Sequence, residues 1–457
     1  MPYFTKMNHL KLYILTLCLG LFIGCSDGKK EQAVTVMFTC DTQGRLEPCG
    51  CFSGQYGGLA RIATRADYFT DGTVIKVDAG NSVPDNKDYN LIMYKYVQEA
   101  FKKIGYDAVN VGAHELTLSL DQLKNINQNN CPPIISANLV NKQTQERIFK
   151  DHVQFERDGL KIAIVGVVDP TIPGETLGEG LAVKDMPSAI TESLKGTQEA
   201  DFRVLLAYCS KEKMHELAKK FFEFDLIIGG AVQQPSQKLE RINRSYVLYT
   251  TNKAKNVGHV SGLFKSGNGL SDVDYDIPLL FEQVPEKKEI LDLADAYRKE
   301  IRNTKLDCDI HNKDQEDLVP GVTSQASYVG SQTCASCHSN AHKIWQGTAH
   351  AHAFATLEKK NSDADPRCIK CHTVGFGEPS GYKREFKNTK LVNVSCESCH
   401  GPGSEHVKQR MSPEKVLFKY RPLGEGDCRQ CHHGEFSRPF DWKKMWPKIK
   451  HGKESQK

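Results

Sequence analysis

Four copies of one pentapeptide constrain this chain more than any other sequence feature. Each has the form C-x-x-C-H, and all lie in the last third of the 457 residues: Cys334-Ala-Ser-Cys337-His338, Cys368-Ile-Lys-Cys371-His372, Cys396-Glu-Ser-Cys399-His400 and Cys428-Arg-Gln-Cys431-His432. The two thiols of such a motif can form thioethers with porphyrin vinyl groups, and the adjacent imidazole can bind the iron. Chance predicts on the order of 0.02 such motifs at this Cys and His content. The pattern therefore predicts four covalent c-type haems, with the histidine of each motif as proximal ligand.

Two other chemistries use paired cysteines. Zinc sites built from C-x-x-C pairs are one alternative, and four disulfides are the other. Zinc binding does not require a histidine directly after every second cysteine. A disulfide between residues i and i+3 is strained and also leaves the histidines unexplained. Haem attachment is the interpretation that accounts for every residue of the motif.

The region that carries the motifs is short for a region that binds four haems. It runs for 118 residues from Cys334 to His451, which is about 30 residues per haem. A chain this short cannot build a large core from side chains alone. We therefore expect the porphyrins themselves to form the core of a mainly α-helical domain. Six more histidines in the region are candidates for second axial ligands: His342, His350, His352, His406, His433 and His451. Ligation by two histidines at every iron is possible, and so is one open iron.

Three stretches of this region resemble a known family. They are C-E-S-C-H-G-P-G-S-E-H at 396–406, T-A-H-A-H-A-F at 348–354 after Trp345, and W-P-K-I-K-H-G at 446–452. Together they resemble the tetrahaem cytochromes c of the nitrifier type, over about residues 327–453. The resemblance implies distal ligands at His350, His406 and His451, and one haem that is five-coordinate. His342 is a further candidate ligand and His352 competes with His350, whereas His433 fits a surface or propionate-binding role better.

The N-terminus carries an export pattern. Lys6, His9 and Lys11 precede an apolar run at 12–23, and Gly24-Cys25 follows it. A basic segment, about a dozen apolar residues and a small residue predict a secretory signal over 1–24. Leu21-Phe22-Ile23-Gly24-Cys25 resembles a bacterial lipobox, which implies lipidation of Cys25 and a tether at 25–32. An ordinary signal peptide or a single anchor helix is the alternative. We expect an exported protein, in the periplasm or at the cell surface, held to a membrane by its lipid.

Between these ends the hydrophobic pattern alternates between strand and helix. Short apolar runs predict buried strands at 34–39, 74–77, 108–111, 134–137, 161–168, 202–207 and 225–229, and helices at 88–104, 119–128, 187–199 and 211–222. More β-structure is expected at 245–280, a charged helix at 286–303 and a linker at 305–327. The pattern predicts a layered α/β domain over 33–282, a helix and linker over 283–327 and the haem domain over 328–457.

The α/β part resembles the calcineurin-like metallophosphoesterases of the 5′-nucleotidase type. The matching stretches lie at 38–46, 57–61, 77–81, 111–115, 205–209 and 225–234. The resemblance implies loops that hold two metal ions, which clamp a phosphate and activate water. Asp41 and His114 match the family pattern. Other ligand positions depart from it, with Gln43, Asn81, Ala113, Cys209, Ala231 and Gln233 in their place. Amide and alanine side chains supply neither charge nor strong metal donation, so we expect no ordinary phosphoesterase chemistry.

Cysteines occur where the ligands are lost. Loops after parallel strands meet at one sheet edge, so Cys40, Cys49, Cys51 and Cys209 could come together. Three hypotheses remain open: a zinc or copper(I) site, a pair of disulfides, and a reactive thiol that exchanges electrons with the haems. The glycines of 50–58 indicate a loop that approaches a ligand or another backbone closely.

Charge narrows the function classes. The chain has 60 basic and 56 acidic residues, a net charge of +4, which excludes a strongly basic nucleic-acid binder. We expect electron transfer through four haems to redox partner proteins, such as cytochromes or quinol-linked complexes. The α/β domain would bind a partner, a metal or a substrate. The alternatives are a haem-dependent reductase or oxidase of a small nitrogen or sulfur compound, a periplasmic phosphoesterase, and a pure binding module.

Overall fold

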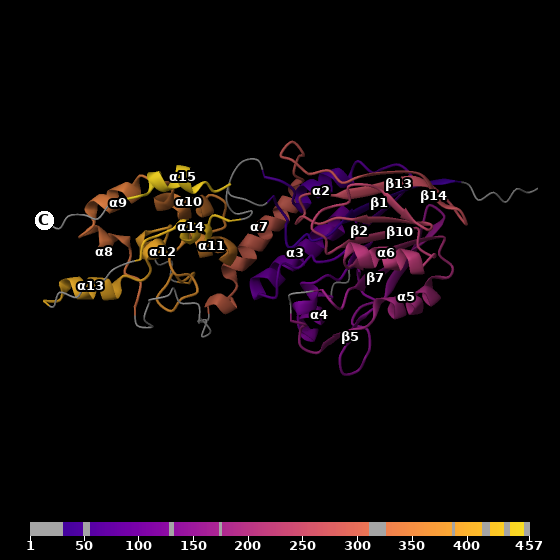
Figure 1. Cartoon of the computed structure of the whole chain (residues 1–457), viewed down its shortest axis with the longest axis horizontal. Helices are drawn as coiled ribbons and strands as arrows, with labels where there is room; N and C mark the ends of the chain where they lie inside the picture. Colours follow the sequence, from indigo (N-terminus) through magenta and orange to yellow (C-terminus); the bar gives the residue numbers. More distant parts are fainter. Residues whose placement is uncertain are drawn as a thin grey trace, which may run out of the picture.

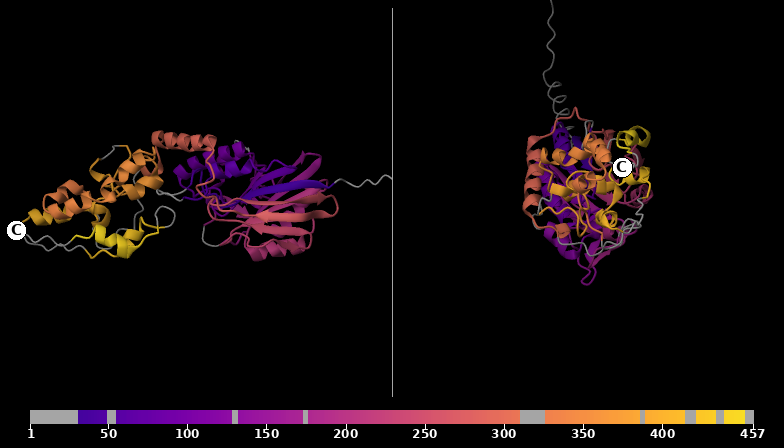
Figure 2. Two further views of the ribbon diagram at one scale, coloured as in Figure 1. Left: turned by 90° about the horizontal axis from the view of Figure 1, so that it is seen from above. Right: turned by 90° about the vertical axis from the view of Figure 1, so that its left-hand side faces the viewer.

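The computed structural model describes residues 31–48, 55–127, 132–172, 176–309, 326–385, 389–413, 421–433 and 439–451. Two regions follow one another along the long axis of the molecule, an α/β domain and a region of short helices (Figure 1). The view from above shows the same order, with helix α7 between the two regions (Figure 2). The predicted division into an α/β part and a helical part is confirmed.

Two six-stranded sheets form the α/β domain. The first has the order β14-β13-β1-β2-β3-β4 and the second β11-β12-β10-β9-β7-β6. The strands of the first sheet are β1 (Gln32–Thr39), β2 (Thr73–Asp78), β3 (Ala108–Asn110), β4 (Ile134–Ile135), β13 (Gly258–Lys265) and β14 (Gly269–Asp276). Those of the second are β6 (His152–Arg157), β7 (Leu160–Val168), β9 (Phe202–Tyr208), β10 (Leu226–Gly230), β11 (Glu240–Ile242) and β12 (Ser245–Tyr249). β5 (Leu139–Asn141) and β8 (Leu181–Val183) form a separate pair.

The central strands are parallel and buried. β1 pairs with β2, β2 with β3 and β3 with β4 in parallel register, and β7, β9, β10 and β12 do so in the second sheet. Strands covered on both faces need nearly continuous apolar sequence, which explains runs such as LKIAIVGVV in β7. The antiparallel edge strand β14 alternates apolar and charged residues because one of its faces meets solvent.

Helices cover the outer faces of both sheets. The first sheet carries α2 (Leu59–Ala66), α3 (Asp88–Ile104) and α7 (Lys288–Asn303), with α4 (Leu120–Ile126) nearby. The second sheet carries α5 (Met186–Leu194) and α6 (Lys211–Lys220). One hydrophobic cluster lies between the sheets and beneath the first helices, and the other lies under α5 and α6. The result is a four-layered α/β sandwich.

The carboxyl ends of the parallel strands face the C-terminal region. β1 starts at the far end of the domain and runs toward the helical region in both views (Figures 1 and 2). Its parallel neighbours run the same way. The loops that follow these strands therefore lie at the edge of the domain nearest the four C-x-x-C-H motifs.

The C-terminal region consists of short helices. They are α8 (Ser331–Ala335), α9 (Ser339–Gln346), α10 (Ala353–Glu358), α11 (Pro366–His372), α12 (Cys396–His400), α13 (Ser404–Met411), α14 (Glu425–Arg429) and α15 (Trp442–Met445). Its buried hydrophobic cluster contains Leu357, Ile369, Val374, Tyr382 and Leu391. A core of this size is too small to hold a region of more than 100 described residues together. The motifs themselves sit in α8, α11, α12 and α14 and the turns that follow them.

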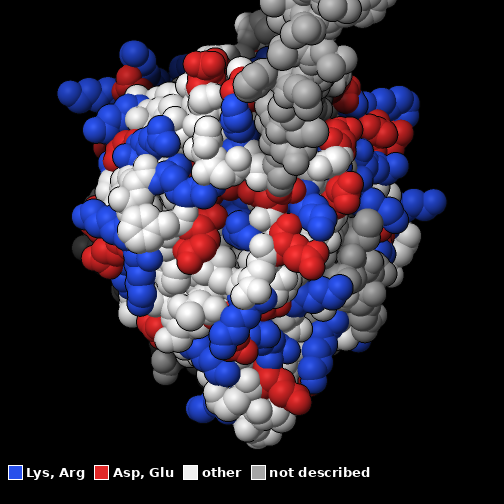
Figure 3. Space-filling model, turned by 90° about the vertical axis from the view of Figure 1, so that its right-hand side faces the viewer, with Lys and Arg blue, Asp and Glu red and all other residues white. Residues whose placement is uncertain are grey.

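Two general features of the described part bear on partners. None of its helices combines the length and the apolar character that crossing a bilayer requires. The face of the α/β domain that points away from the helical region mixes Lys and Arg with Asp and Glu (Figure 3).

Candidate haem centres and the pocket of the α/β domain

Three motif histidines each face a second histidine. His338 lies opposite His406, His350 opposite His432, and His400 opposite His451. The ring centroids of these pairs are 6.1, 5.9 and 6.0 Å apart. Each pair joins one motif histidine to one of the three candidates that the family resemblance had implied.

The spacing of the pairs fits a metal ion between the rings. A metal–imidazole bond is about 2.0 Å long and a ring nitrogen lies about 1.1 Å from the ring centroid, so two imidazoles on opposite sides of one ion have centroids about 6 Å apart. Burial lowers the pKa of His350, His400, His406 and His432. A lowered pKa favours the neutral imidazole, which is the form that binds metal.

His372, the histidine of the second motif, has a different environment. Its Nδ1 donates a hydrogen bond to the Ala353 carbonyl, at 2.7 Å. This bond orients the ring and would leave Nε2 as the nitrogen that can bind a metal ion. Among the described residues, no ring contact pairs His372 with a second histidine.

The remaining candidates lie elsewhere. His342 follows His338 by one turn and packs its ring against Trp345, with centroids 5.2 Å apart. His352 ends the short helical turn that begins at Ala349, two residues after His350. The structure thus places His342 beside an aromatic ring rather than opposite a motif histidine, and His350 rather than His352 opposite His432.

Cysteines of different motifs are neighbours. In the haem-loaded protein these sulfurs would be thioethers at the porphyrin edges. The neighbours are Cys334 with Cys396, Cys371 with Cys431 and Cys399 with Cys428, each pair being close enough for one thiol to change the pKa of the other. The first motif therefore adjoins the third, the third adjoins the fourth, and the fourth adjoins the second.

A second site lies at the carboxyl edge of the sheets. An open pocket of about 340 Å³ is lined by Asp41, Gln43, Asn81, Tyr208, Ala231, Val232, Gln233, Thr251, Asn252 and Lys253. Asp41, Gln43, Asn81 and Ala231 all have positive φ angles, from 42° to 66°. Such backbone is costly for residues other than glycine and persists only where the surrounding structure enforces it. The pocket occupies the place where the family resemblance expects metal ions.

The Asp41 carboxylate is held by neutral donors. Asn81 Nδ2 and the Tyr208 hydroxyl donate to Oδ1, at 2.7 and 3.0 Å, and the Thr251 hydroxyl donates to Oδ2, at 2.7 Å. A pair of metal ions needs several charged or imidazole ligands, and within the described residues no three His, Cys, Asp or Glu side chains are grouped to hold one. The side chains present do not fit a two-metal centre.

The loops of the pocket are fixed by two more residues. His114 donates its backbone N–H to Asn81 Oδ1, at 2.8 Å, and its Nδ1 bonds to the Val83 carbonyl, at 2.8 Å. The buried Glu115 carboxylate accepts backbone N–H groups of Asn81, Ser82, Val83 and Gly112 at 2.8–3.2 Å. Burial raises the pKa of Glu115. Residues of Val111–Glu115 thus hold the loop after β2 in place by hydrogen bonds.

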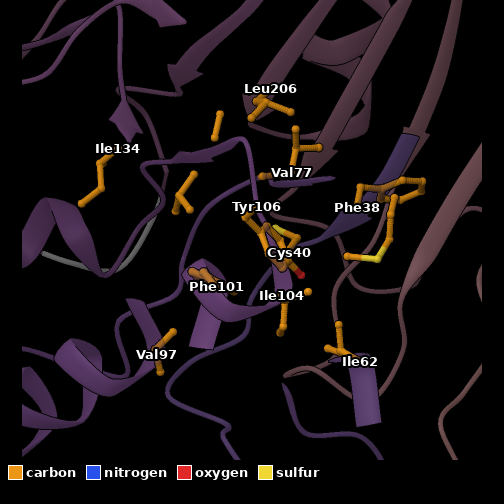
Figure 4. Close-up of a cluster of buried hydrophobic side chains, with 14 of the residues drawn as sticks. Phe38, Cys40, Ile62, Val77, Val97, Phe101, Ile104, Tyr106, Ile134 and Leu206 are labelled. Carbon is orange, nitrogen blue, oxygen red and sulfur yellow. The ribbon is translucent and has the colours of Figure 1, made fainter. Parts of the chain in front are cut away.

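Cys40 is a core residue. Its side chain lies among buried apolar groups such as Phe38, Val77 and Tyr106 (Figure 4). Its thiol contacts the Gly80 carbonyl at 3.4 Å. Burial first, and then the neighbouring Asp41, raises the pKa of this thiol. A buried thiol with a raised pKa is inert toward oxidants and soft metals.

Cys209 lies on the other side of the second sheet. Tyr208 turns to the pocket, and the next residue turns the opposite way, as successive residues of a strand do. Cys209 therefore joins the cluster under α5 and α6, where burial raises its pKa. The expectation that Cys40 and Cys209 meet at the sheet edge is wrong for this reason. Cys49 and Cys51 lie outside the described residues.

Two glycines bring the pocket loops together. Gly57 and Gly58 have φ angles of 75° and 90°. A Cβ on Gly57 would lie 2.1 Å from the Ala254 carbonyl oxygen, and one on Gly58 would lie 2.6 Å from backbone atoms of Glu47 and Pro48. The close approach expected from the glycine pattern is made to backbone.

Sequence reasoning gave no role to three residues that hold the pocket and its loops. Tyr208 and Thr251 donate to Asp41, and Glu115 accepts from the backbone of the loops. Nothing in the local sequence marks Tyr208 or Thr251. Glu115 follows His114 directly, and a carboxylate at the start of a short helical turn was the available signal.

The C-terminal region matches known cytochromes. Residues 333–401 match the family described as cytochrome c554 and c-prime. Cytochrome c-554 of Nitrosomonas europaea is 34% identical, over 24% of this chain and 60% of its own length.

The α/β domain matches nucleotidases. The 5′-nucleotidase of Vibrio vulnificus is 26% identical over 53% of this chain and 51% of its own length. Among solved structures, a 5′-nucleotidase precursor of Thermus thermophilus superposes with a TM-score of 0.51 at 18% identity, covering 59% of each chain. A sulfate thiohydrolase of Thermus thermophilus also superposes with 0.51, at 15% identity, over 58% of this chain and 60% of its own. Identities this low establish the fold alone.

The chain spans only part of the curated relatives that it matches. The chain covers about half the length of the 5′-nucleotidases and 60% of the cytochrome. The two matches fall on different regions of this chain, in agreement with the division seen in the fold. The chain therefore joins an α/β domain of the 5′-nucleotidase and calcineurin-like phosphoesterase fold to a C-terminal region similar to the cytochrome c554 family.

Proposed function

We propose that the chain is an exported electron-transfer protein that carries four covalent haems, one on each C-x-x-C-H motif. The observation that carries the proposal is the set of three histidine pairs with ring centroids 5.9–6.1 Å apart, each including a motif histidine. When bound, the haems would supply one-electron transfer. The protein would fix their order, close three of the irons with a second histidine and exclude water from them.

The contacts between motifs support an arrangement in which the four haems form one continuous row. The neighbouring sulfurs link the first motif to the third, the third to the fourth and the fourth to the second. The first and second motifs would then be the two ends. Electrons would pass along the row to a redox partner protein, such as a cytochrome or a quinol-linked complex.

The second motif has a distinct role in the proposal. Its histidine has no described histidine opposite it, so its iron would keep an open position. An open iron favours the second candidate function, a haem-dependent reduction or oxidation of a small nitrogen or sulfur compound.

Carbon monoxide distinguishes the two functions. The dithionite-reduced holoprotein is titrated with carbon monoxide, and one haem in four is expected to bind it. In a His406→Ala variant a second haem should respond, because that side chain faces His338. His342→Ala is the matched control, since His342 faces Trp345, and it should bind as the parent does. No binding by the parent would leave the electron carrier and remove the haem enzyme.

The location is part of the proposal. The pattern around Cys25 supports a lipidated N-terminus, and this segment lies outside the described residues. Cell fractionation tests it: the parent should stay with membranes and Cys25→Ser should be released, whereas Cys18→Ser should behave as the parent. Release of neither variant would contradict the lipid anchor.

The α/β domain would bind a partner or a substrate without metal ions. The neutral donors around Asp41 support this role over hydrolysis of phosphate esters, which remains the weaker alternative. The pocket faces the haem region, so a molecule held there would lie on the side of the domain nearest the haems.

A further inference from the structure

Helix α7 (Lys288–Asn303) lies between the α/β domain and the second motif (Figures 1 and 2). On one side it is fixed to the α/β domain. Glu300 accepts hydrogen bonds from Lys95 Nζ at 2.8 Å and from the Tyr96 hydroxyl at 2.6 Å, both on α3. Ile290, Ala294, Tyr297 and Ile301 are buried in the domain's main hydrophobic cluster.

The other side of α7 holds the segment that leads into the second motif. The Arg302 guanidinium binds the Asp363 carboxylate with both arms, at 2.9 and 2.5 Å, and also reaches the Asn361 carbonyl at 3.4 Å. In the reverse direction Arg384 donates to the Ile301 carbonyl, at 2.5 Å. A bidentate pair of this kind fixes orientation as well as distance.

A buried cluster continues the contact to the start of α11 (Pro366–His372). The Arg367 guanidinium lies 5.1 Å from the ring centroid of Tyr297, which is 1% exposed. Arg367 is held by Asp365, with Nη2–Oδ2 at 2.6 Å, and Asp365 also caps α11 through the Arg367 N–H, at 3.0 Å. Ala364 belongs to the same hydrophobic cluster as the α/β core. The helix with Cys368, Cys371 and His372 therefore starts on a surface made by α7.

Helix α7 also contacts the loop after β1, which carries Asp41 of the pocket. Arg298 forms an ion pair with Glu47, which follows Asp41 in the loop after β1. Burial raises the pKa of Glu47, and the positive charge of Lys360 lies close enough to Glu47 to reduce this rise. α7 thus contacts the pocket loop at one turn and the second motif's segment at the next.

We propose that Arg302 and Tyr297 are positioning residues for the second haem, through which the α/β domain sets the redox potential and ligand affinity of that haem alone. The proposal rests on the proposed function, because Cys368 and Cys371 must carry a haem. A shift of α11 would change the hydrogen bond from His372 to the Ala353 carbonyl. The orientation and basicity of an axial histidine tune the potential and the affinity of its iron.

The test measures the redox potential of each haem separately. Arg302→Gln is made in the full-length holoprotein, and the four potentials are resolved by spectroelectrochemistry, together with the carbon monoxide dissociation constant. We expect one of the four potentials to shift and the dissociation constant to change about two- to fivefold, the range for losing a partly exposed ion pair. The reversed pair Arg302→Asp with Asp363→Arg should restore both values.

Matched controls separate positioning from general damage. Asp292→Asn removes the exposed Lys288–Asp292 pair on the same helix and should change nothing. If the Arg302→Gln protein does not retain its haems, Arg302→Lys is tested instead. Lysine keeps the positive charge but cannot make the two parallel hydrogen bonds of a guanidinium. Unchanged values in all four haems, or an equal shift in all four, would overturn the proposal. A parent that binds no carbon monoxide would contradict the open iron of the proposed function, while the four potentials would still decide this proposal.

Discussion

At the scale of single residues, the pocket is held together by hydrogen bonds that neutral side chains donate to the Asp41 carboxylate. Asn81 stands at a position where the resemblance implies a metal ligand, and its amide donates directly to Asp41 at 2.7 Å. Two carboxylates at this distance would repel each other unless a cation lay between them. An amide–carboxylate hydrogen bond removes that repulsion, so the loops keep their positions without metal.

Asp78 predicts a dependence of stability on pH. It is fully buried and accepts from the Thr39 hydroxyl, the Ser82 hydroxyl and the Gly80 N–H, and burial raises its pKa to about 7. The folded protein then holds a proton between about pH 4 and pH 7 that the unfolded chain releases, so stability should fall as the pH rises through this window.

The measurement is calorimetric unfolding of the holoprotein at pH 5 and pH 7. Asp78→Asn should flatten the decline, because the amide does not titrate. The exposed Asp71→Asn is the control and should decline as the parent does. A decline of the same size in Asp78→Asn and in the parent would show that another group is responsible.

At the scale of elements, the buried strands are where the sequence analysis succeeded. Predicted strands at 34–39, 161–168 and 202–207 correspond to β1, β7 and β9, because strands covered on both faces need unbroken apolar runs. Helix α2 was missed, since eight residues make only about two turns. The edge strand β6 was missed because its polar residues face solvent.

The glycine loop before α2 gives a prediction at this scale. Gly57→Ala should destabilise the α/β domain strongly, since its Cβ would lie 2.1 Å from the Ala254 oxygen as well as at φ 75°. Gly267→Ala is the control: its φ is 86° but nothing lies within 4 Å. We expect Gly267→Ala to cost about 1 kcal/mol and Gly57→Ala at least about 3 kcal/mol in the free energy of unfolding. Equal losses in thermal unfolding would contradict the close packing at Gly57.

At the scale of the whole molecule, the pocket edge and the second motif lie on the same side of the α/β domain, with α7 between them. The arrangement gives the domain a direct mechanical link to one end of the proposed row of haems. A domain attached only by a linker would have no such contact.

Hydrolytic activity should be absent from the intact protein. With added Mn²⁺ or Zn²⁺, release of phosphate from a nucleoside monophosphate is expected to stay at the background rate, because Asp41 is occupied by neutral donors and no cluster of ligands lies beside it in the described part of the chain. Asp41→Asn serves as the control. Turnover that disappears in Asp41→Asn would restore the phosphoesterase.

The sequence by itself predicts the chemistry that depends on neighbours along the chain. Cysteines and a histidine within five residues define a haem-attachment motif whatever the fold, and continuous apolar runs define buried strands. Only the tertiary structure decided which groups meet. It placed His350 opposite His432, 82 positions away, and it separated Cys40 from Cys209 because adjacent positions at a strand end face opposite sides of a sheet. Contacts between distant residues depend on packing, which local sequence does not encode.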